Sequence, residues 1–214
     1  MADKSKELEA SDLGALLCSK VCHDIISPVG AITNGLELME EDIDGSMREM
    51  AMDLIKRSAT QASAKLKFAR IAYGAAGSAG AEIDTGDAEE VAQGYMAAEK
   101  ANLEWKIERQ YLPKNEVKLV LNLLLLALNC VPQGGTITIS MKKEDGNPTF
   151  KLLCSGLKAR VADSIAEMVK SLPEEVPVDA HTVQPYYSGL LARLSGLSVT
   201  MLMEGEDVVI TASA

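Results

Sequence analysis

Apolar residues recur every three or four positions along the N-terminal part of the chain, which is the spacing of one face of an α-helix. We predict a single long helix from Ser11, a suitable N-cap, to about Glu41. Pro28 lies inside it and is expected to bend it, because proline cannot donate a helical hydrogen bond. The apolar stripe comprises Leu13, Leu17, Val21, Ile25, Val29, Ile32, Leu36 and Met39.

His23, one of two histidines in the chain, lies about 200° around this helix from Val21 and Ile25, at about 100° per residue. It is therefore predicted to face solvent. The side chains on this side of the helix are small and mostly uncharged, so a partner could approach the histidine closely. The residues that share this side are Ser19, Ser27, Gly30 and Asn34, with the bulkier Ile26 beside them.

A second helix is predicted after a tight turn at residues 42–45. Ser46 and Glu49 have the spacing of a capping box, and a weaker apolar stripe follows. Two long helices joined by a short turn form a helical hairpin, which cannot bury its stripe on both sides. We therefore expect two hairpins to associate as a homodimeric four-helix bundle. The second stripe consists of Met50, Leu54, Ala62, Leu66, Ala69 and Tyr73.

The small-residue run at positions 74–80 contains three glycines and indicates a linker. We divide the chain into a disordered N-terminus (1–10), a helical hairpin domain (11–74), a linker (75–80) and a second domain (81–214). The second domain alternates strands and helices, and its hairpin signals predict a mostly antiparallel sheet covered by helices on one face. The fold class is α+β. Expected strands are near 82–84, 103–108, 136–141, 149–154, 198–203 and 208–212, and expected helices near 87–100, 115–130, 159–171 and 182–195.

The chain is acidic, with a formal net charge of −10 and no cluster of basic residues, which disfavours nucleic acid and anionic membranes as partners. A protein partner is favoured. The first twelve residues lack the apolar core of a signal peptide, and the longest apolar run, 119–131, is too short to span a bilayer. We expect a cytoplasmic protein without a membrane helix.

The four cysteines lack paired CxxC spacing and lie in apolar segments, so we expect reduced, buried thiols. Cys18 and Cys22 are one helical turn apart next to His23, which raises a metal site as an alternative. No fourth ligand is evident, and we predict no metal bound by this chain. His181 lies in a loop-like stretch and is predicted to be a surface or capping residue.

The stretch from His23 to Ile32 resembles the phosphoacceptor H-box of dimeric sensor histidine kinases, in which histidine, an acid, an aliphatic residue, Ser or Thr, and proline recur in this order. The predicted hairpin matches the dimerisation and phosphotransfer domain of that family. The second domain resembles the kinases' ATP-binding domain. Asn122 and the segment 134–139 have the frame of the N-box and of the strand after it.

Three nucleotide-binding elements of the kinases are missing. Leu126 stands where an active kinase has a second, Mg²⁺-binding asparagine, and an aliphatic side chain cannot ligate that cation. Cys154 replaces the aspartate of the adenine-reading box. The late phosphate loop, at 184–189, keeps one glycine and carries two tyrosines. The resemblance therefore implies that this chain binds neither nucleotide nor a cofactor of its own.

An intact H-box joined to a degenerate ATP domain is similar to the dimeric histidine phosphotransferases of the ChpT type. Those proteins relay a phosphoryl group in alphaproteobacterial cell-cycle control. The resemblance implies that the donor is the receiver domain of a CckA-like hybrid histidine kinase, and that CtrA-like and CpdR-like response regulators are the acceptors. The partner receivers would supply the Mg²⁺.

By this resemblance His23 is the phosphoacceptor, Asp24 orients its ring, and Ser27 touches the phosphoryl oxygens. The expected docking face comprises Ser19, Ile26, Gly30 and Asn34. For Asp24 and Ser27 the alternative is an ordinary solvated helix residue. Two other functions remain open, namely a divergent but active autokinase and a dimeric scaffold that binds receivers without transferring phosphate.

Overall fold

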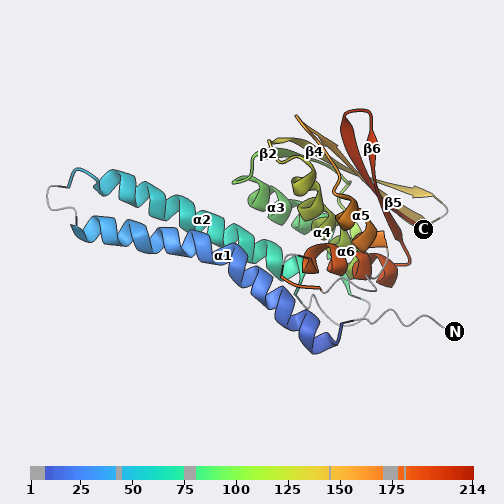
Figure 1. The fold of residues 1–214 in the computed structure, drawn as a ribbon, viewed down its shortest axis with the longest axis horizontal. Helices are drawn as coiled ribbons and strands as arrows, with labels where there is room; N and C mark the ends of the chain where they lie inside the picture. Colours follow the sequence, from blue (N-terminus) through green and yellow to red (C-terminus); the bar gives the residue numbers. More distant parts are fainter. Residues whose placement is uncertain (1–7, 42–44, 75–80, 145, 171–177, 181) are drawn as a thin grey trace.

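The computed structural model describes residues 8–214 except 42–44, 75–80, 145, 171–177 and 181. An antiparallel hairpin of two long helices, α1 (Ala10–Glu41) and α2 (Arg48–Ala72), projects from an α/β domain (Figure 1). The long first helix is confirmed, with its predicted end at Glu41. The predicted linker 75–80, most of the predicted disordered N-terminus, and His181 lie outside the described residues.

Close helix packing holds the hairpin together. Gly35 is buried, and a Cβ atom there would lie 2.6 Å from Ile55 Cγ1 and 3.2 Å from the Ala51 carbonyl oxygen. The two helices can therefore approach this closely only because position 35 has no side chain. Pro28 is also buried, and α1 runs through it without interruption but changes direction along its length (Figure 1).

The predicted start of α2 is wrong. The helix begins at Arg48, and its N-cap, Met47, makes no side-chain capping hydrogen bond. The turn before it explains the shift: Gly45 has a φ of +77°, and its carbonyl accepts a hydrogen bond from the Arg48 amide at 3.4 Å. Ser46 is thus part of the turn, so the expected Ser46–Glu49 capping box does not start the helix.

Part of the predicted apolar stripe of α2 lies outside the single hairpin. Met50 and Leu66 are 66% and 51% exposed in the single chain, whereas Ala62 of the stripe is buried together with Ala51 and Ser58. Small residues are buried because they permit the close approach to α1. Size has therefore decided which face of α2 packs inside the hairpin, and larger apolar side chains are left on its outside.

The α/β domain has one five-stranded sheet with helices over one face (Figure 1). The elements of this domain are β1 (Glu82–Asp84), α3 (Thr85–Met96), β2 (Ala101–Lys106), β3 (Tyr111–Pro113), α4 (Lys114–Cys130), β4 (Gly135–Glu144), β5 (Asn147–Ser155), α5 (Asp163–Lys170), α6 (Val183–Leu194), β6 (Ser198–Glu204) and β7 (Asp207–Ser213). The strand order of the five-stranded sheet is β2-β4-β5-β7-β6, and among these described strands only the β2–β4 pair is parallel. The predicted α+β class is confirmed.

The base of the hairpin shares its hydrophobic core with the α/β domain. Phe68 and Ala72 of α2 belong to the same buried cluster as the central helix α4 and the sheet. Phe68 also packs its ring on Tyr95 of α3, with centroids 4.6 Å apart. The position of the hairpin is therefore set by packing as well as by the covalent connection.

Two of the four cysteine predictions are wrong. Cys18 and Cys22 are exposed on α1, whereas Cys130 and Cys154 are buried in the α/β domain. The first pair lies off the apolar stripe of its helix, so the hydrophobicity of the surrounding segment did not indicate burial at those two positions.

Among the described residues, only α1 is long and apolar enough to cross a membrane by length and composition. The longest apolar run of the sequence, 119–131, lies instead in and just after the largely buried helix α4. In the structure α1 packs against α2 along the hairpin and, near its start, against the α/β core through Leu13 and Leu17.

Candidate phosphotransfer site

His23 stands on the open side of α1, with 81% of its side chain exposed, as the helical period predicts. Its Nδ1 atom lies 3.6 Å from Asp24 Oδ1, slightly too far for a hydrogen bond. The Asp24 carboxylate instead accepts a 3.1 Å hydrogen bond from Lys20 Nζ one turn earlier, and both side chains are mostly buried. The acid next to His23 is therefore held in place by Lys20.

The other predicted docking residues also lie on the exposed part of α1. Ser19, Ser27 and Asn34 are exposed, and Ile26 is 69% exposed. Gly30 is half-buried, and a Cβ atom there would meet nothing within 4 Å. The helix thus presents small side chains around His23, an arrangement that gives another protein access to the imidazole.

Asp24 lies where the hairpin meets the α/β domain. A narrow gap there is lined by Asp24 together with Val21, Ile25, Lys65, Phe68, Ala69, Tyr73 and Leu125. Burial raises the pKa of Tyr73 and Tyr95, and the nearby Asp24 charge raises both further. Asp24, the neighbour of His23 in sequence, therefore interacts electrostatically with Tyr95 of α3 and with Tyr73 at the end of α2.

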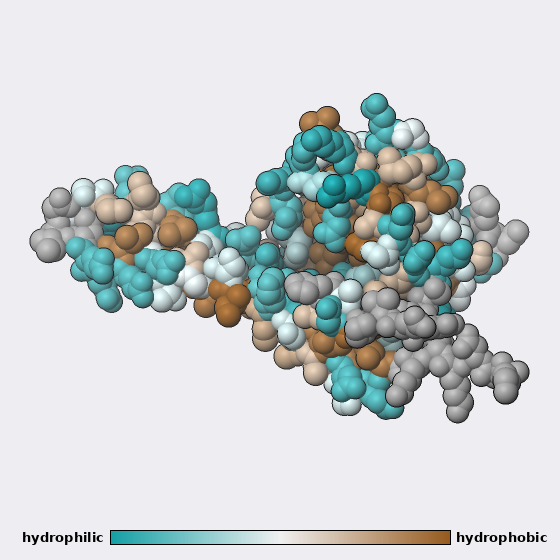
Figure 2. Space-filling view, viewed as in Figure 1, coloured by the Kyte–Doolittle hydropathy of each residue, from teal (hydrophilic) through white to brown (hydrophobic). Residues whose placement is uncertain are grey.

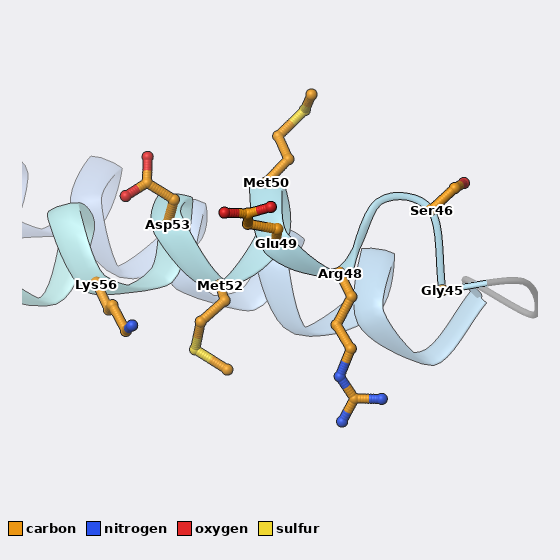
Figure 3. Close-up of a pocket in the computed structure, with 8 residues that line it drawn as sticks. All are labelled: Gly45, Ser46, Arg48, Glu49, Met50, Met52, Asp53 and Lys56. Carbon is orange, nitrogen blue, oxygen red and sulfur yellow. The ribbon is translucent and has the colours of Figure 1, made fainter.

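A wider hollow of about 820 Å³ lies at the tip of the hairpin. Figure 3 shows that its side chains do not converge, since Met50 and Arg48 point to opposite sides of α2. Polar groups that bind a small molecule normally converge on it. We assign no site to this hollow.

The residues that the resemblance assigns to the nucleotide boxes pack inside the α/β domain. Leu126 and Cys154 are buried in the core. The pKa of the Cys154 thiol is raised by its hydrogen bond with the Cys130 thiol and by burial. Tyr186 and Tyr187 are buried on α6, as expected for packing residues.

Asn122, the first asparagine of the N-box frame, is fully engaged inside the protein. Its side-chain amide donates to the carbonyl oxygens of Ala72, at 3.1 Å, and Lys118, at 2.7 Å. Its oxygen accepts a 2.7 Å hydrogen bond from Gln184 Nε2. This role of Gln184 was not predicted, although a glutamine among apolar residues at 183–187 indicates a need for a buried partner.

Metal ligands are not gathered within the described part of the chain, which has no group of three or more His, Cys, Asp or Glu side chains suited to one ion. The alternative built on Cys18, Cys22 and His23 therefore receives no support from the geometry.

Residues 85–207 match the family model described as the histidine phosphotransferase C-terminal domain. The chain belongs to the histidine phosphotransferase family. Within that class it is similar to the protein phosphotransferase ChpT of Brucella abortus (strain 2308), at 51% identity over 96% of this chain and 97% of that protein. It is also similar to a solved bacterial phosphotransferase, at 48% identity and a TM-score of 0.88, covering 97% of this chain and 98% of that one.

These similarities cover the hairpin as well as the α/β domain, and they confirm the resemblance to ChpT-type phosphotransferases drawn from the H-box and the degenerate nucleotide boxes. Phosphotransfer is the class of activity that follows from membership in this family.

Proposed function

We propose that His23 is the phosphoacceptor of a multi-step His-Asp phosphorelay, receiving a phosphoryl group from one receiver domain and passing it to another. The observation that carries this proposal is an open imidazole on the hairpin helix, 81% exposed, beside a fixed carboxylate. The receivers expected from the resemblance are those of a CckA-like hybrid kinase and of CtrA-like and CpdR-like regulators. We expect the protein to act in the cytoplasm, where such receivers would meet it.

In the proposed mechanism the neutral His23 ring attacks the phosphorus of the receiver's acyl phosphate through Nε2. A nitrogen–phosphorus bond forms as the phosphorus–oxygen bond to the receiver carboxylate breaks. Nδ1, which keeps its proton, gains positive charge and faces Asp24 at 3.6 Å. Asp24 thereby stabilises the charge that develops on the ring. Transfer to the second receiver reverses these steps.

Most of the barrier in such a transfer is lowered by in-line positioning and charge neutralisation. The small side chains of Ser19, Ser27 and Asn34 leave room for the receiver's active-site loops. Ser27, one turn after His23, would donate a hydrogen bond to a phosphoryl oxygen. The Mg²⁺ required for receiver chemistry would be held by the receiver.

We also propose that the functional unit is a homodimer. Several large apolar side chains on the hairpin are exposed in the single chain, and Figure 2 shows apolar surface there between hydrophilic residues. A second hairpin would cover them in a four-helix bundle. They are Val29 and Leu36 of α1 and Met52 and Leu66 of α2.

A phosphotransfer assay tests the function directly. The protein is mixed with a radiolabelled, phosphorylated receiver and Mg²⁺ in one tube, and with labelled ATP and Mg²⁺ in another. We expect acid-labile label from the receiver, none from ATP, and none at all in His23→Ala. Lys56→Ala, a change on the exposed surface of α2, is the matched control and should transfer normally.

The alternative functions give different results. Label taken directly from ATP would identify a divergent autokinase. A His23→Ala protein that binds receivers and retains the physiological effect would identify a non-catalytic scaffold.

A further inference from the structure

A chain of buried hydrogen bonds joins the hairpin to the α/β domain. The Tyr73 hydroxyl, just after α2, donates to Gln184 Oε1 on α6 at 2.6 Å. Gln184 Nε2 donates to Asn122 Oδ1 on α4 at 2.7 Å, and the Asn122 amide donates to the Ala72 carbonyl at 3.1 Å. The carbonyl at the end of a helix has no partner within that helix, so Asn122 satisfies the last residue of α2.

The centre of the network is buried and its members are paired. Asn122 is completely buried, Gln184 is 6% exposed, and Tyr73 is half-buried. Burial raises the pKa of Tyr73 well above its ordinary value, so its hydroxyl remains a donor at neutral and moderately alkaline pH. A fully satisfied network of this kind favours one relative arrangement of its elements, because any other arrangement leaves polar groups unpaired in the interior.

The start of α1, at the base of the hairpin, is attached to the same part of α6. The Leu8 amide, immediately before α1, donates a 2.9 Å hydrogen bond to the Tyr186 hydroxyl. The Tyr73 and Tyr187 rings also contact each other, with centroids 6.0 Å apart. The chain therefore enters α1 and leaves α2 while bonded to the first two turns of α6.

We propose that Tyr73, Asn122, Gln184 and Tyr186, which we call the α6 clamp, fix the angle between the hairpin and the α/β domain. Given the function proposed for His23, these are positioning residues. They touch no reacting atom but hold the His23 face in a constant relation to the α/β surface. A receiver then meets a preformed two-part surface, which lowers the ordering cost of binding. Asn122, Gln184 and Tyr186 fall in the stretches that resemble the N-box and the phosphate loop of the kinases.

Gln184→Leu in the full-length protein removes both side-chain bonds with little change in volume. We expect backbone amide exchange in the last turn of α2, residues 69–73, to accelerate by about tenfold, because local opening no longer breaks those bonds. In the phosphotransfer assay we expect KM for the phosphorylated receiver to rise by about fivefold to tenfold, with kcat within about twofold, since binding and not chemistry loses preorganisation. Tyr73→Phe should give the same pattern more weakly.

Ser188→Ala is the matched control. The Ser188 hydroxyl is buried on α6 and donates to the Gln184 carbonyl at 2.9 Å, a bond within one helix. This variant should leave both amide exchange at 69–73 and KM close to wild type. If Gln184→Leu fails to fold, Tyr73→Phe, which loses only one hydroxyl, carries the test.

Two results would overturn the proposal. One is exchange at 69–73 that is no faster in Gln184→Leu and Tyr73→Phe than in Ser188→Ala. The other is accelerated exchange with an unchanged KM, which would show a structural bond without a positioning role. A wild-type protein that accepts no phosphoryl group would refute the proposed function instead, while the exchange data still decide whether the clamp exists.

Discussion

At the scale of single residues, the proposed phosphotransfer chemistry depends on three neighbouring side chains of α1. His23 is open to solvent, and Asp24 is held between the histidine ring and the Lys20 ammonium group. A carboxylate that is already anchored can stabilise a developing positive charge with little reorganisation. This arrangement supports an electrostatic role for Asp24 more than that of a freely solvated acid.

Replacing the acid tests that role. We expect Asp24→Asn to slow phosphotransfer by about tenfold, because the attraction between unit charges about 4 Å apart at an exposed site is of order 1 kcal/mol or more. Lys20→Met keeps the carboxylate and should reduce the rate less. The measurement is the single-turnover transfer rate from a phosphorylated receiver. Equal rates for Asp24→Asn and wild type would favour the alternative of an ordinary helix acid.

The helical period was sufficient to predict that His23 faces solvent, because it depends only on local geometry. It did not identify the partner of Asp24, although Lys20 lies four residues earlier, the spacing at which helix side chains meet. The exposure of Cys18 and Cys22 was missed because the hydrophobicity of a segment was taken as evidence for burial of each of its members.

At the scale of elements, the hairpin depends on the close approach of α1 and α2 at Gly35. The sequence predicted both helices, and Ala62 of the predicted α2 stripe is buried. The pattern did not indicate that Ala51 packs inside the hairpin while Met50 and Leu66 lie outside it in the single chain. The packing distance between two helices is a tertiary property, and a single-helix pattern does not contain it. The short strand β3 was not predicted, because it is extended through its pairing with β1, in which Leu112 faces Ile83, and a local pattern does not show such a long-range pairing.

Gly35→Val is expected to destabilise the hairpin. The new side chain would overlap Ile55 and press on the Ala51 carbonyl, at a cost of about 1–3 kcal/mol for overpacking. Gly14→Ala is the control, because a Cβ at Gly14 meets nothing within 4 Å and alanine favours helix by up to about 1 kcal/mol. Chemical denaturation at fixed protein concentration measures both. A Gly35→Val protein as stable as wild type would contradict the close packing.

The whole molecule is acidic, and one carboxylate links several parts of the α/β domain. Asp84 caps α3 by accepting from the Gly86 amide at 2.8 Å and also accepts three hydrogen bonds from Arg109, at 3.2, 2.9 and 2.8 Å. The Arg109 hydrogen bonds, followed by the Gly86 amide, lower the pKa of Asp84. The stabilisation is therefore present above the ordinary carboxyl pKa, about 4, and is lost as the pH falls through the lower folded value.

Asp84→Asn should consequently be less stable than wild type at neutral pH, and the difference should shrink below about pH 4. Thermal unfolding followed from pH 7 to pH 3 measures this. Asp53→Asn removes an exposed pair with Arg57 and should have little effect at any pH, since exposed ion pairs contribute little. A constant difference between Asp84→Asn and wild type across this range would refute the linkage.

The order of strands and helices in the α/β domain was predictable from periodicity and turn residues. The connection between the domains was not, since Tyr73, Asn122 and Gln184 meet across separations of 62 and 111 residues. Such contacts depend on the assembled fold. Locally, the sequence indicates them only by an isolated polar residue within an apolar run.

The use of Asn122 as an internal bonding partner also bears on what a change toward a kinase-like N-box would cost. Leu126→Asn, the simplest substitution toward that box, would place an amide at a position 1% exposed among apolar side chains, at a cost of about 1–3 kcal/mol if it stays unpaired. Freeing Asn122 for a ligand would in turn leave Gln184 and the Ala72 carbonyl without their partners. Single substitutions toward such a box are therefore expected to destabilise the α/β domain, so that they are selected against on stability alone.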